Sequence, residues 1–235
     1  MKDDTNQLVS VIISVYNGEM HLAETVKSVI SQSYRRIEII IIDDGSTDGS
    51  GKVAQGFIPS VRYHYQPNDG IAAAWNRGIE LATGDFFAFN GADDLWTENK
   101  IERQMEVFRT HSALDIVFGH VKQFHSPELS DEEKQKIWCP DELMPGVSAG
   151  TMLIKRESFF SVGLFNMVWR RGIFNDWYLR ATERGLRVHM MPDLLMLRRL
   201  HQNNHGTINR DKSVDYVRML KASLDRRRLQ SADEV

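Results

Sequence analysis

Apolar and polar residues follow one another in blocks along the first half of the chain. An almost continuous apolar run, "LVSVIISVY" (8–16), ends at Asn17 and Gly18, and apolar residues then recur at helical spacing from Leu22 to Ile30. A run rich in β-branched residues without polar alternation is typical of a strand covered on both faces. We therefore expect a buried strand followed by a helix.

The same scheme repeats further along the chain. The segments 37–42, 61–66 and 85–90 predict three more strands, and the stretch 72–82 has the spacing of a helix that ends before Gly84. Ser46, Thr47 and Asp48 follow the second strand and are candidate helix caps. Helical stretches between buried strands indicate parallel strands with right-handed crossovers.

The second half of the chain has a looser pattern. We expect a helix at 97–110, a strand at 114–121, a strand running into a helix at 150–160, a helix from a cap at Asn175 to Gly185, a strand at 186–191 and a terminal helix at 213–228. Residues 122–146 carry three of the six prolines and several charges, which predicts a long excursion over the sheet edge. The pattern predicts an α/β fold with a mostly parallel central sheet and helices on both faces.

Composition narrows the class of protein. The chain has 235 residues, 42% of them hydrophobic, which fits one domain (1–235) with a substantial core. A net charge of −3 argues against a nucleic-acid binder with a strongly basic surface. Cys139 is the single cysteine, so no intrachain disulfide can form, and no apolar segment approaches the length of a membrane span. We expect a soluble, cytoplasmic protein that at most contacts the inner face of a membrane weakly.

Polar residues follow all four predicted strands of the first half. They are Tyr16 and Asn17, Asp43 and Asp44, Asn68 and Asp69, and the run 90–94. Ligands of open parallel sheets bind beyond the carboxyl ends of the strands, where these residues meet. The sequence therefore predicts a binding site at this edge.

Each carboxylate at this edge has two interpretations. Asp44 could cap the following helix, or it could accept a hydrogen bond from a nucleobase imide or a ribose hydroxyl. Asp93 and Asp94 could be turn residues, or one of them could hold a divalent cation together with phosphate oxygens, as Mg²⁺ and Mn²⁺ are commonly bound.

Several segments together resemble a known family. The segments "VSVIISVYNG", "IEIIIIDDGSTDGS", "AAAWNRGIELATGDFFAFNGADD", "VGLFN" and "NDWYLRATERG" are similar, in order and spacing from about Val9 to His201, to family 2 glycosyltransferases of the GT-A fold. The resemblance implies a single GT-A-like, Rossmann-like nucleotide-binding domain. Residues 8–121 would form its nucleotide-sugar half, 122–212 its acceptor side, and 213–235 a C-terminal helix and tail.

The resemblance also assigns roles to residues. Asp93 and His201 would bind a metal, either Mn²⁺ or Mg²⁺. The residues expected to contact the nucleotide sugar are Val15, Tyr16, Asn17, Glu19, Asp44, Asn76, Ala92, Asp93, Asp94 and Arg199. Gly91 stands where the family usually has the first Asp of its Asp-x-Asp signature, so the chain lacks one carboxylate there.

Asp176 is the expected catalytic residue. Without the resemblance, it would be interpreted as an acid that favours the first turn of a helix. In the family the corresponding segment usually reads Glu-Asp and its Asp is the general base; Asp176 matches, whereas Asn175 replaces the Glu. An inverting transfer needs such a carboxylate to take the proton of the attacking hydroxyl.

The sequence therefore favours an inverting, metal-dependent, non-processive glycosyltransferase. Its donor would be a nucleotide sugar, by resemblance a UDP-sugar, and its acceptor a glycan, a lipid-linked saccharide or a small molecule. Two alternatives remain: a catalytically inactive nucleotide-sugar-binding module, motivated by Gly91 and Asn175, and a nucleotidyltransferase. The second is weaker, because no glycine-rich basic loop follows the first strand.

Overall fold

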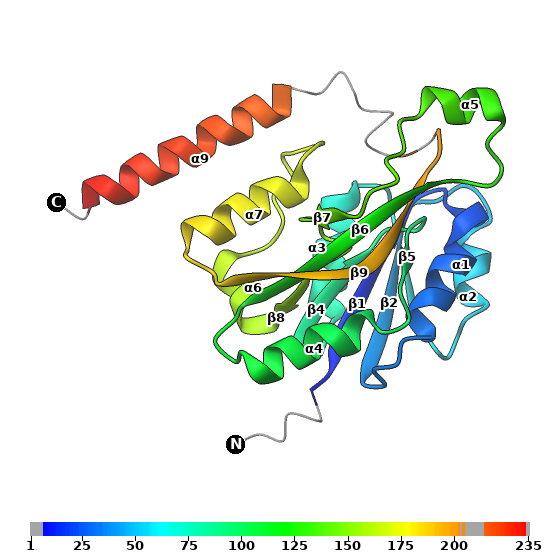
Figure 1. Cartoon of the computed structure of the whole chain (residues 1–235), viewed down its shortest axis with the longest axis horizontal. Helices are drawn as coiled ribbons and strands as arrows, with labels where there is room; N and C mark the ends of the chain where they lie inside the picture. The colour runs from blue at the N-terminus through cyan, green and yellow to red at the C-terminus, as the bar shows by residue number, and fades with distance from the viewer. Residues whose placement is uncertain (1–6, 203, 205–213, 234–235) are drawn as a thin grey trace.

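The computed structural model describes residues 7–202, 204 and 214–233. Strands and helices alternate through the first half, as expected, and the second half is more irregular (Figure 1). The elements are, in chain order, β1 (Val9–Val15), α1 (Glu19–Ile30), β2 (Ile37–Asp44), α2 (Ser50–Gln55), β3 (Arg62–Gln66), α3 (Ile71–Leu81), β4 (Phe86–Asn90), β5 (Leu95–Trp96), α4 (Lys100–Thr110), β6 (Ile116–His125), α5 (Asp131–Lys136), β7 (Met144–Gly146), β8 (Leu153–Lys155), α6 (Arg156–Val162), α7 (Ile173–Glu183), β9 (Val188–Leu200) and α9 (Val214–Asp233).

The strands form one sheet in the order β3-β2-β1-β4-β8-β6-β9-β5, with β7 paired to β6. The strands β3, β2, β1 and β4 are parallel, and β6 and β9 form a second long parallel ladder. The antiparallel pairs that involve β5, β7 and β8 are short. The predicted α/β fold with a mostly parallel sheet is therefore confirmed. The carboxyl ends of β1, β2 and β4 lie at one edge.

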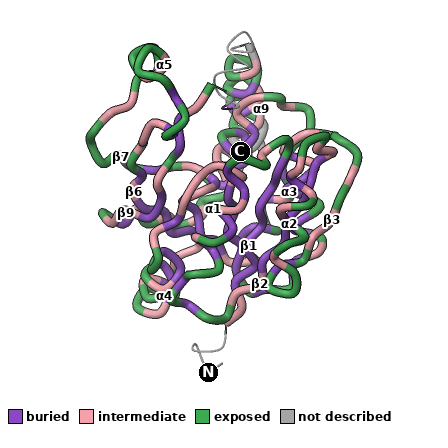
Figure 2. Tube along the Cα trace, turned by 90° about the vertical axis from the view of Figure 1, so that its right-hand side faces the viewer, coloured by how far each residue is buried: buried purple, intermediate pink, exposed green. Residues whose placement is uncertain are grey.

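Two hydrophobic clusters cover the two faces of this sheet. Side chains alternate across a strand, so Val9, Val11 and Ile13 of β1 pack with α1 and α4, while Ile12 packs with α3, α6 and α7 on the other face. Figure 2 shows the buried strands enclosed between exposed helix surfaces, with α5 projecting from one end. The core thus holds the strand ends rigidly from both sides.

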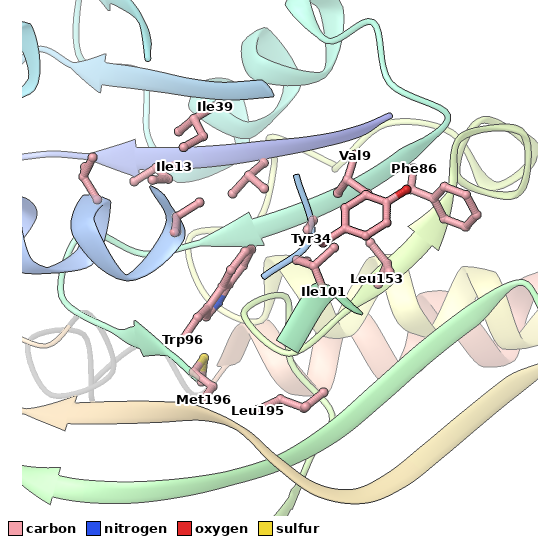
Figure 3. Packing of buried hydrophobic residues seen from close by; sticks show 14 of the residues in the cluster. Val9, Ile13, Tyr34, Ile39, Phe86, Trp96, Ile101, Leu153, Leu195 and Met196 are labelled. Atoms are coloured by element: carbon pink, nitrogen blue, oxygen red, sulfur yellow. The ribbon is translucent and has the colours of Figure 1, made fainter. Parts of the chain in front are cut away.

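One buried lysine belongs to this core. Lys100, at the start of α4, is fully buried; its Nζ lies 2.8 Å from Gln104 Oε1 and 4.1 Å from the centroid of the Trp96 ring. Burial lowers the pKa of Lys100 well below its ordinary value, because a charged ammonium loses its hydration there. Trp96 packs beside Ile101 and Met196 (Figure 3).

Several predicted boundaries were wrong. Asn175 is exposed and does not cap α7, which begins at Ile173 after Gly172 in the left-handed conformation. The stretch 122–146 is not one loop, since it contains the end of β6, the short helix α5 with a Ser130–Glu133 capping box, and β7. The strand expected at 186–191 continues to Leu200, because it pairs along the whole of β6.

Among the residues that the structure describes, none forms a helix long and apolar enough to cross a membrane. The longest helix, α9, carries exposed Val217, Leu220 and Leu224 beside several arginines, and it packs against α7.

Candidate active site

The turn after β1 is tied to the loop after β2. Asn17 has a φ of 50°, and its Oδ1 accepts a hydrogen bond from the Thr47 amide at 2.8 Å. Its own amide donates to Ser46 Oγ at 3.0 Å. Tyr16 is 56% exposed beside this junction, so its ring is accessible to a ligand, whereas Val15 is buried in the core. Asn17 therefore shapes the edge of the site, and Tyr16 presents an aromatic surface on it.

Glu19 occupies the same junction from α1. Its carboxylate accepts a hydrogen bond from the Gly49 amide, and its own amide donates to Asp48 Oδ2 at 3.1 Å. Asp48 Oδ1 in turn accepts from the Ser50 amide at 2.9 Å, at the start of α2. These acids thus hold α1 and α2 together, and the predicted contact of Glu19 with a nucleotide sugar stays a prediction.

Asp44 is buried at the end of β2, where three donors surround its carboxylate. Oδ1 accepts from Gln66 Nε2 at 2.7 Å and from the Asp69 amide at 3.0 Å, and Oδ2 accepts from the Gly70 amide at 2.8 Å. Gly70 precedes α3 with a φ of 92°. Asp44 therefore orders the loop after β3. It does not cap the following helix α2, whose N-cap is Gly49 without a side-chain cap bond, so the capping interpretation was wrong. Its predicted contact with a nucleotide stays a prediction.

Its neighbour Asp43 has a structural role. Asp43 Oδ1 accepts from the Ser46 amide at 2.8 Å, and Oδ2 accepts from the Tyr63 hydroxyl at 2.8 Å. Burial, and then the bond to Asp43, raise the pKa of Tyr63 to about 12. Of the two adjacent acids at the end of β2, Asp43 therefore stabilises the turn that follows, and Asp44 lies at the edge of the site.

Asp93 and His201 meet at the end of the sheet. His201 Nε2 lies 3.0 Å from Asp93 Oδ2, although the two residues are 108 positions apart in the sequence. Asn204 Nδ2 donates to the same oxygen at 3.1 Å. The Asp93 side chain keeps 29% of its surface exposed. The two residues expected to bind a metal are therefore in contact at an accessible position, which we call the metal corner (Asp93, Asp94, His201).

Arg199 supports the metal corner from inside the protein. It is 2% exposed, its Nε donates to the Asp93 carbonyl at 3.0 Å, and its amide donates to Asp94 Oδ1 at 3.0 Å. The rest of the guanidinium pairs with Glu24 and reaches Ser126 Oγ at 3.4 Å. The charge of Arg199 is thus turned toward protein groups, and the residue fixes the backbone that carries Asp93.

The acid pair itself is electrostatically unfavourable without a cation. Burial, and then the neighbouring Asp93 carboxylate, raise the pKa of Asp94. A divalent ion would reverse this effect by stabilising both charges. Ala92 lies within contact of Gly18, since a Cβ added at Gly18 would be 3.0 Å from Ala92 Cβ. A Cβ added at Gly91 would meet Asp93 Oδ1 at 2.8 Å.

Asn76 lies on α3 and is buried away from the metal corner residues. Its Nδ2 donates to the Phe165 carbonyl at 2.9 Å, and its Oδ1 accepts from the Phe165 amide at 3.0 Å. Both ends of the amide are therefore bonded to one backbone residue of the loop before α7. This pairing gives Asn76 a clear structural role, and its predicted contact with a nucleotide sugar stays a prediction.

Asp176 lies in the first turn of α7. It is 1% exposed, and Arg180 Nε donates to its Oδ2 at 3.0 Å. Arg180 also donates to the Val162 and Leu164 carbonyls at 3.0 and 2.8 Å, so its guanidinium is fixed by the preceding segment. Asp176 is thus a buried carboxyl group paired with an arginine through Oδ2.

The metal corner fits a divalent ion that has few protein ligands. Among the described residues, no group of three or more His, Cys, Asp or Glu side chains is arranged to hold a metal. Asp93 and His201 supply one carboxylate oxygen and one imidazole nitrogen. Mg²⁺ and Mn²⁺ sites often use one or two protein groups and complete the shell with phosphate oxygens and water. The donor set therefore fits an ion shared with a diphosphate.

Some residues at the site carried no signal in the sequence. His21 of α1 is buried with its ring centroid 5.1 Å from that of His201, and its Nε2 lies 3.2 Å from Glu128 Oε1. Burial, and then the charge of Arg199, lower the pKa of His21. In the sequence, Glu24 and Glu128 resemble ordinary surface acids. Only their contacts identify them as parts of the support around the metal corner.

Comparison with known proteins decides the family. The family model described as Glycosyl transferase family 2 matches residues 10–176, which is more than half of the chain. The chain belongs to glycosyl transferase family 2. Its family 2 relatives include an uncharacterised glycosyltransferase of Rickettsia typhi, 33% identical over 178 residues that cover 71% of this chain and 56% of that protein. Another is the glycosyltransferase GlyG of Streptococcus pneumoniae, 39% identical over 119 residues, 49% of this chain and 39% of that protein.

The chain spans only part of the curated family 2 proteins that it matches. For an uncharacterised glycosyltransferase of Rickettsia conorii, 33% identical over 178 residues, the match covers 68% of this chain and 28% of that protein. The family 2 domain is thus one part of those longer proteins.

Solved structures confirm the GT-A fold of this family 2 domain. S. aureus TarS 1-349 in complex with UDP-GlcNAc has a TM-score of 0.68 at 16% identity, covering 84% of this chain and 60% of that chain. The mannosyltransferase PcManGT of Pyrobaculum calidifontis, in complex with GDP-Man and Mn²⁺, has a TM-score of 0.67 at 18% identity, covering 94% and 65%. At these identities the likeness is one of fold alone.

Proposed function

We propose that this domain is an inverting, metal-dependent glycosyltransferase. It transfers a sugar from a nucleotide-sugar donor, of the UDP-sugar type, to an acceptor hydroxyl, one sugar at a time. The acceptor is a glycan, a lipid-linked saccharide or a small molecule. The family membership and the nucleotide-sugar complexes of proteins with the same fold support the class of reaction.

The contact between Asp93 and His201 carries this proposal. A carboxylate from the segment after β4 and an imidazole from the end of β9 lie 3.0 Å apart at the carboxyl edge of the parallel strands, where ligands of such sheets bind. An ordinary surface turn would not need the buried Arg199, whose Nε donates to the Asp93 carbonyl and whose amide donates to the Asp94 carboxylate. When bound, a Mn²⁺ or Mg²⁺ ion supplies charge stabilisation for the departing diphosphate.

The chain's own residues divide the remaining work. Asp93 and His201 hold the metal end of the donor, and Tyr16 and Asp44 border the nucleotide. Asp176 accepts the proton of the acceptor hydroxyl at Oδ1, as that hydroxyl oxygen attacks the anomeric carbon opposite the leaving diphosphate. Arg180, bonded to Oδ2, holds the carboxylate in one orientation.

A donor screen tests the proposal. The protein is incubated with UDP-, GDP-, ADP- and CDP-sugars, with and without MnCl₂, and binding is followed by thermal shift while donor hydrolysis and transfer are followed by chromatography. Binding to the native state raises the unfolding temperature. We expect a metal-dependent shift and turnover with a UDP-sugar. Absence of binding, hydrolysis and transfer for every donor would refute the proposal.

A silent binding module is the second candidate, and Gly91 is the observation that favours it. The chain lacks a carboxylate beside Asp93, so the metal corner has one acid fewer than the family pattern. This candidate predicts metal-dependent nucleotide binding without turnover for every donor and acceptor in the screen. The same experiment therefore separates the two functions.

A further inference from the structure

A loop of the acceptor side places an arginine over the nucleotide side. A Cβ built at Gly70 would lie 3.3 Å from Arg170 Nη1, so the guanidinium approaches the loop between β3 and α3 closely. The Gly70 amide donates to Asp44 Oδ2 at 2.8 Å. Arg170 is exposed, and among the described residues no carboxylate pairs with it. Arg170 and the buried carboxylate of Asp44 thus both lie beside the same residue, Gly70.

The loop that carries Arg170 is held at both of its ends. On one side the Phe165 backbone is bonded to Asn76 through both its amide and its carbonyl. On the other side the Arg171 amide donates to Asp215 Oδ2 at 3.3 Å, and Gly172 is so close to α9 that a Cβ there would lie 2.6 Å from Met219 Cε. The position of Arg170 therefore follows from the packing of the loop on α3 and α9.

Asp44 retains room for one further donor. A carboxylate offers about four acceptor positions, two on each oxygen. Asp44 Oδ1 takes two hydrogen bonds, from Gln66 and the Asp69 amide, whereas Oδ2 takes one, from the Gly70 amide. The unused position is on the oxygen that Gly70 contacts, which is the side approached by Arg170.

We propose that Arg170 is a further specificity-determining residue of the proposed donor site. The family pattern already places Asp44 at the base, and Arg170 beside it selects a base that carries a carbonyl next to the imide N–H. Asp44 Oδ2 accepts from the imide N–H, and Arg170 donates to the adjacent carbonyl oxygen. Uracil and guanine carry this donor–acceptor pair. At the same two positions, cytosine and adenine carry an unprotonated ring nitrogen in place of the imide N–H and an amino group in place of the carbonyl. A base bound in the same orientation would therefore meet Asp44 with a lone pair and Arg170 with a donor. The pair rejects the reversed pattern, because a buried acceptor would then face a lone pair. This inference rests on the proposed nucleotide-sugar function.

Nucleotide titration calorimetry tests it. UDP, GDP, CDP and ADP are titrated into the full chain with Mn²⁺ and into the variants Arg170→Gln and Arg170→Lys. The control variant is Arg77→Gln, at an exposed arginine of α3 that pairs with Glu80. We expect UDP and GDP to bind at least tenfold more tightly than CDP and ADP. In Arg170→Gln the affinity for UDP falls about tenfold while that for CDP changes little, as one lost hydrogen bond to a charged group predicts. Arg170→Lys keeps part of the preference, and Arg77→Gln keeps all of it.

Each other outcome overturns the inference in a recognisable way. An equal loss of UDP and CDP affinity in Arg170→Gln means that the guanidinium contacts the diphosphate and not the base. Unchanged affinities mean that Arg170 lies outside the site. If no nucleotide binds to the unmodified chain, the proposed function fails together with the inference, whereas binding of all four nucleotides with equal affinity contradicts the inference alone. Far-ultraviolet circular dichroism of each variant shows that the fold is retained.

Discussion

The metal corner and the start of α7 both hold a carboxylate beside an arginine, yet they differ in access. Asp93 keeps 29% of its side chain exposed and is held by His201 and Asn204, while Arg199 grips its backbone from inside. Asp176 is 1% exposed and is bonded to Arg180 directly. The carboxylate after β4 is therefore accessible to a ligand in this structure, whereas the carboxylate at the start of α7 is enclosed.

This difference has a consequence for the order of events. If Asp176 is the proposed base, an acceptor hydroxyl can reach it only after the groups that bury it move, whereas a ligand can approach Asp93 without such a change. The comparison favours donor binding before acceptor binding.

Removing the charge of Asp176 breaks the acceptor side. Asp176→Asn should lower turnover about 10²- to 10⁴-fold, the usual contribution of a general base. Nucleotide binding should remain unchanged, because Asp176 acts on the acceptor. The rate of sugar transfer and calorimetry of UDP binding measure the two effects. The control is Asp225→Asn, on the exposed face of α9. Equal losses of turnover and binding would remove Asp176 from the role of base.

Removing the charge of Asp93 breaks the donor side. Loss of a residue that orients a metal ligand typically costs 10- to 100-fold in metal affinity, so Asp93→Asn should weaken Mn²⁺ binding by roughly 100-fold or more. Electron paramagnetic resonance of free Mn²⁺ in the presence of UDP measures this without any turnover. Asp141→Asn, an exposed acid of the 122–146 segment, serves as the matched control. Unchanged Mn²⁺ affinity would mean that the pair Asp93–His201 is purely structural.

Adding a carboxylate at position 91 sharpens the comparison. A Cβ added at Gly91 meets only the movable Asp93 Oδ1, so Gly91→Asp should fold with a small shift of that side chain. If the added acid contributes about 1.4 kcal/mol to holding the ion, Mn²⁺ affinity in the presence of UDP rises about tenfold. Gly91→Asn is the neutral control. A fall in affinity would show that repulsion among three acids outweighs the added ligand.

Lys100 is a charge that serves neither side, and its removal should change stability only. Its folded pKa lies below the ordinary value, so between that pKa and about 10.4 the unfolded chain binds more protons, and stability rises with pH. Lys100→Met should therefore raise the midpoint of thermal unfolding at pH 7, by roughly 2–4 °C for each kcal/mol gained, and the difference should shrink toward pH 10. Calorimetry at several pH values measures it. A difference that is constant with pH would show that the ammonium is not the cause.

The sequence predicted the first half of the fold well for a physical reason. Strands buried on both faces leave continuous apolar runs, and the turns between them need the Asn, Asp and Gly residues that mark them, so 8–90 could be interpreted locally. Strand β9 was predicted too short, because Pro192 and Asp193 interrupt its apolar pattern, whereas its pairing with β6 continues to Leu200. Likewise Asn175 has the chemistry of a cap, but Gly172 begins the turn.

At the site, the sequence identified chemistry better than contacts. The family pattern singled out Asp93 and His201, which the structure brings together. It could not reveal that the charge of Arg199 faces Glu24, or that Arg170 reaches Gly70, since both depend on segments distant in the sequence. The sequence therefore did not identify residues whose role depends on a bond to another segment's backbone or to a neighbouring side chain.

The bond pair between Asn76 and Phe165 limits how this domain could be recombined. The two residues are 89 positions apart in the sequence, and the side-chain amide of Asn76 makes two hydrogen bonds to the backbone of Phe165, a pair that we call the latch. Any residue at position 165 except proline has the backbone amide and carbonyl that these two bonds need. A chimaera that takes its acceptor loop from another protein would thus keep the latch as long as it keeps Asn76. A chimaera that replaces α3 would lose it, even with the loop intact. The boundary between exchangeable parts therefore runs through α3, and not through the change of pattern at residue 121.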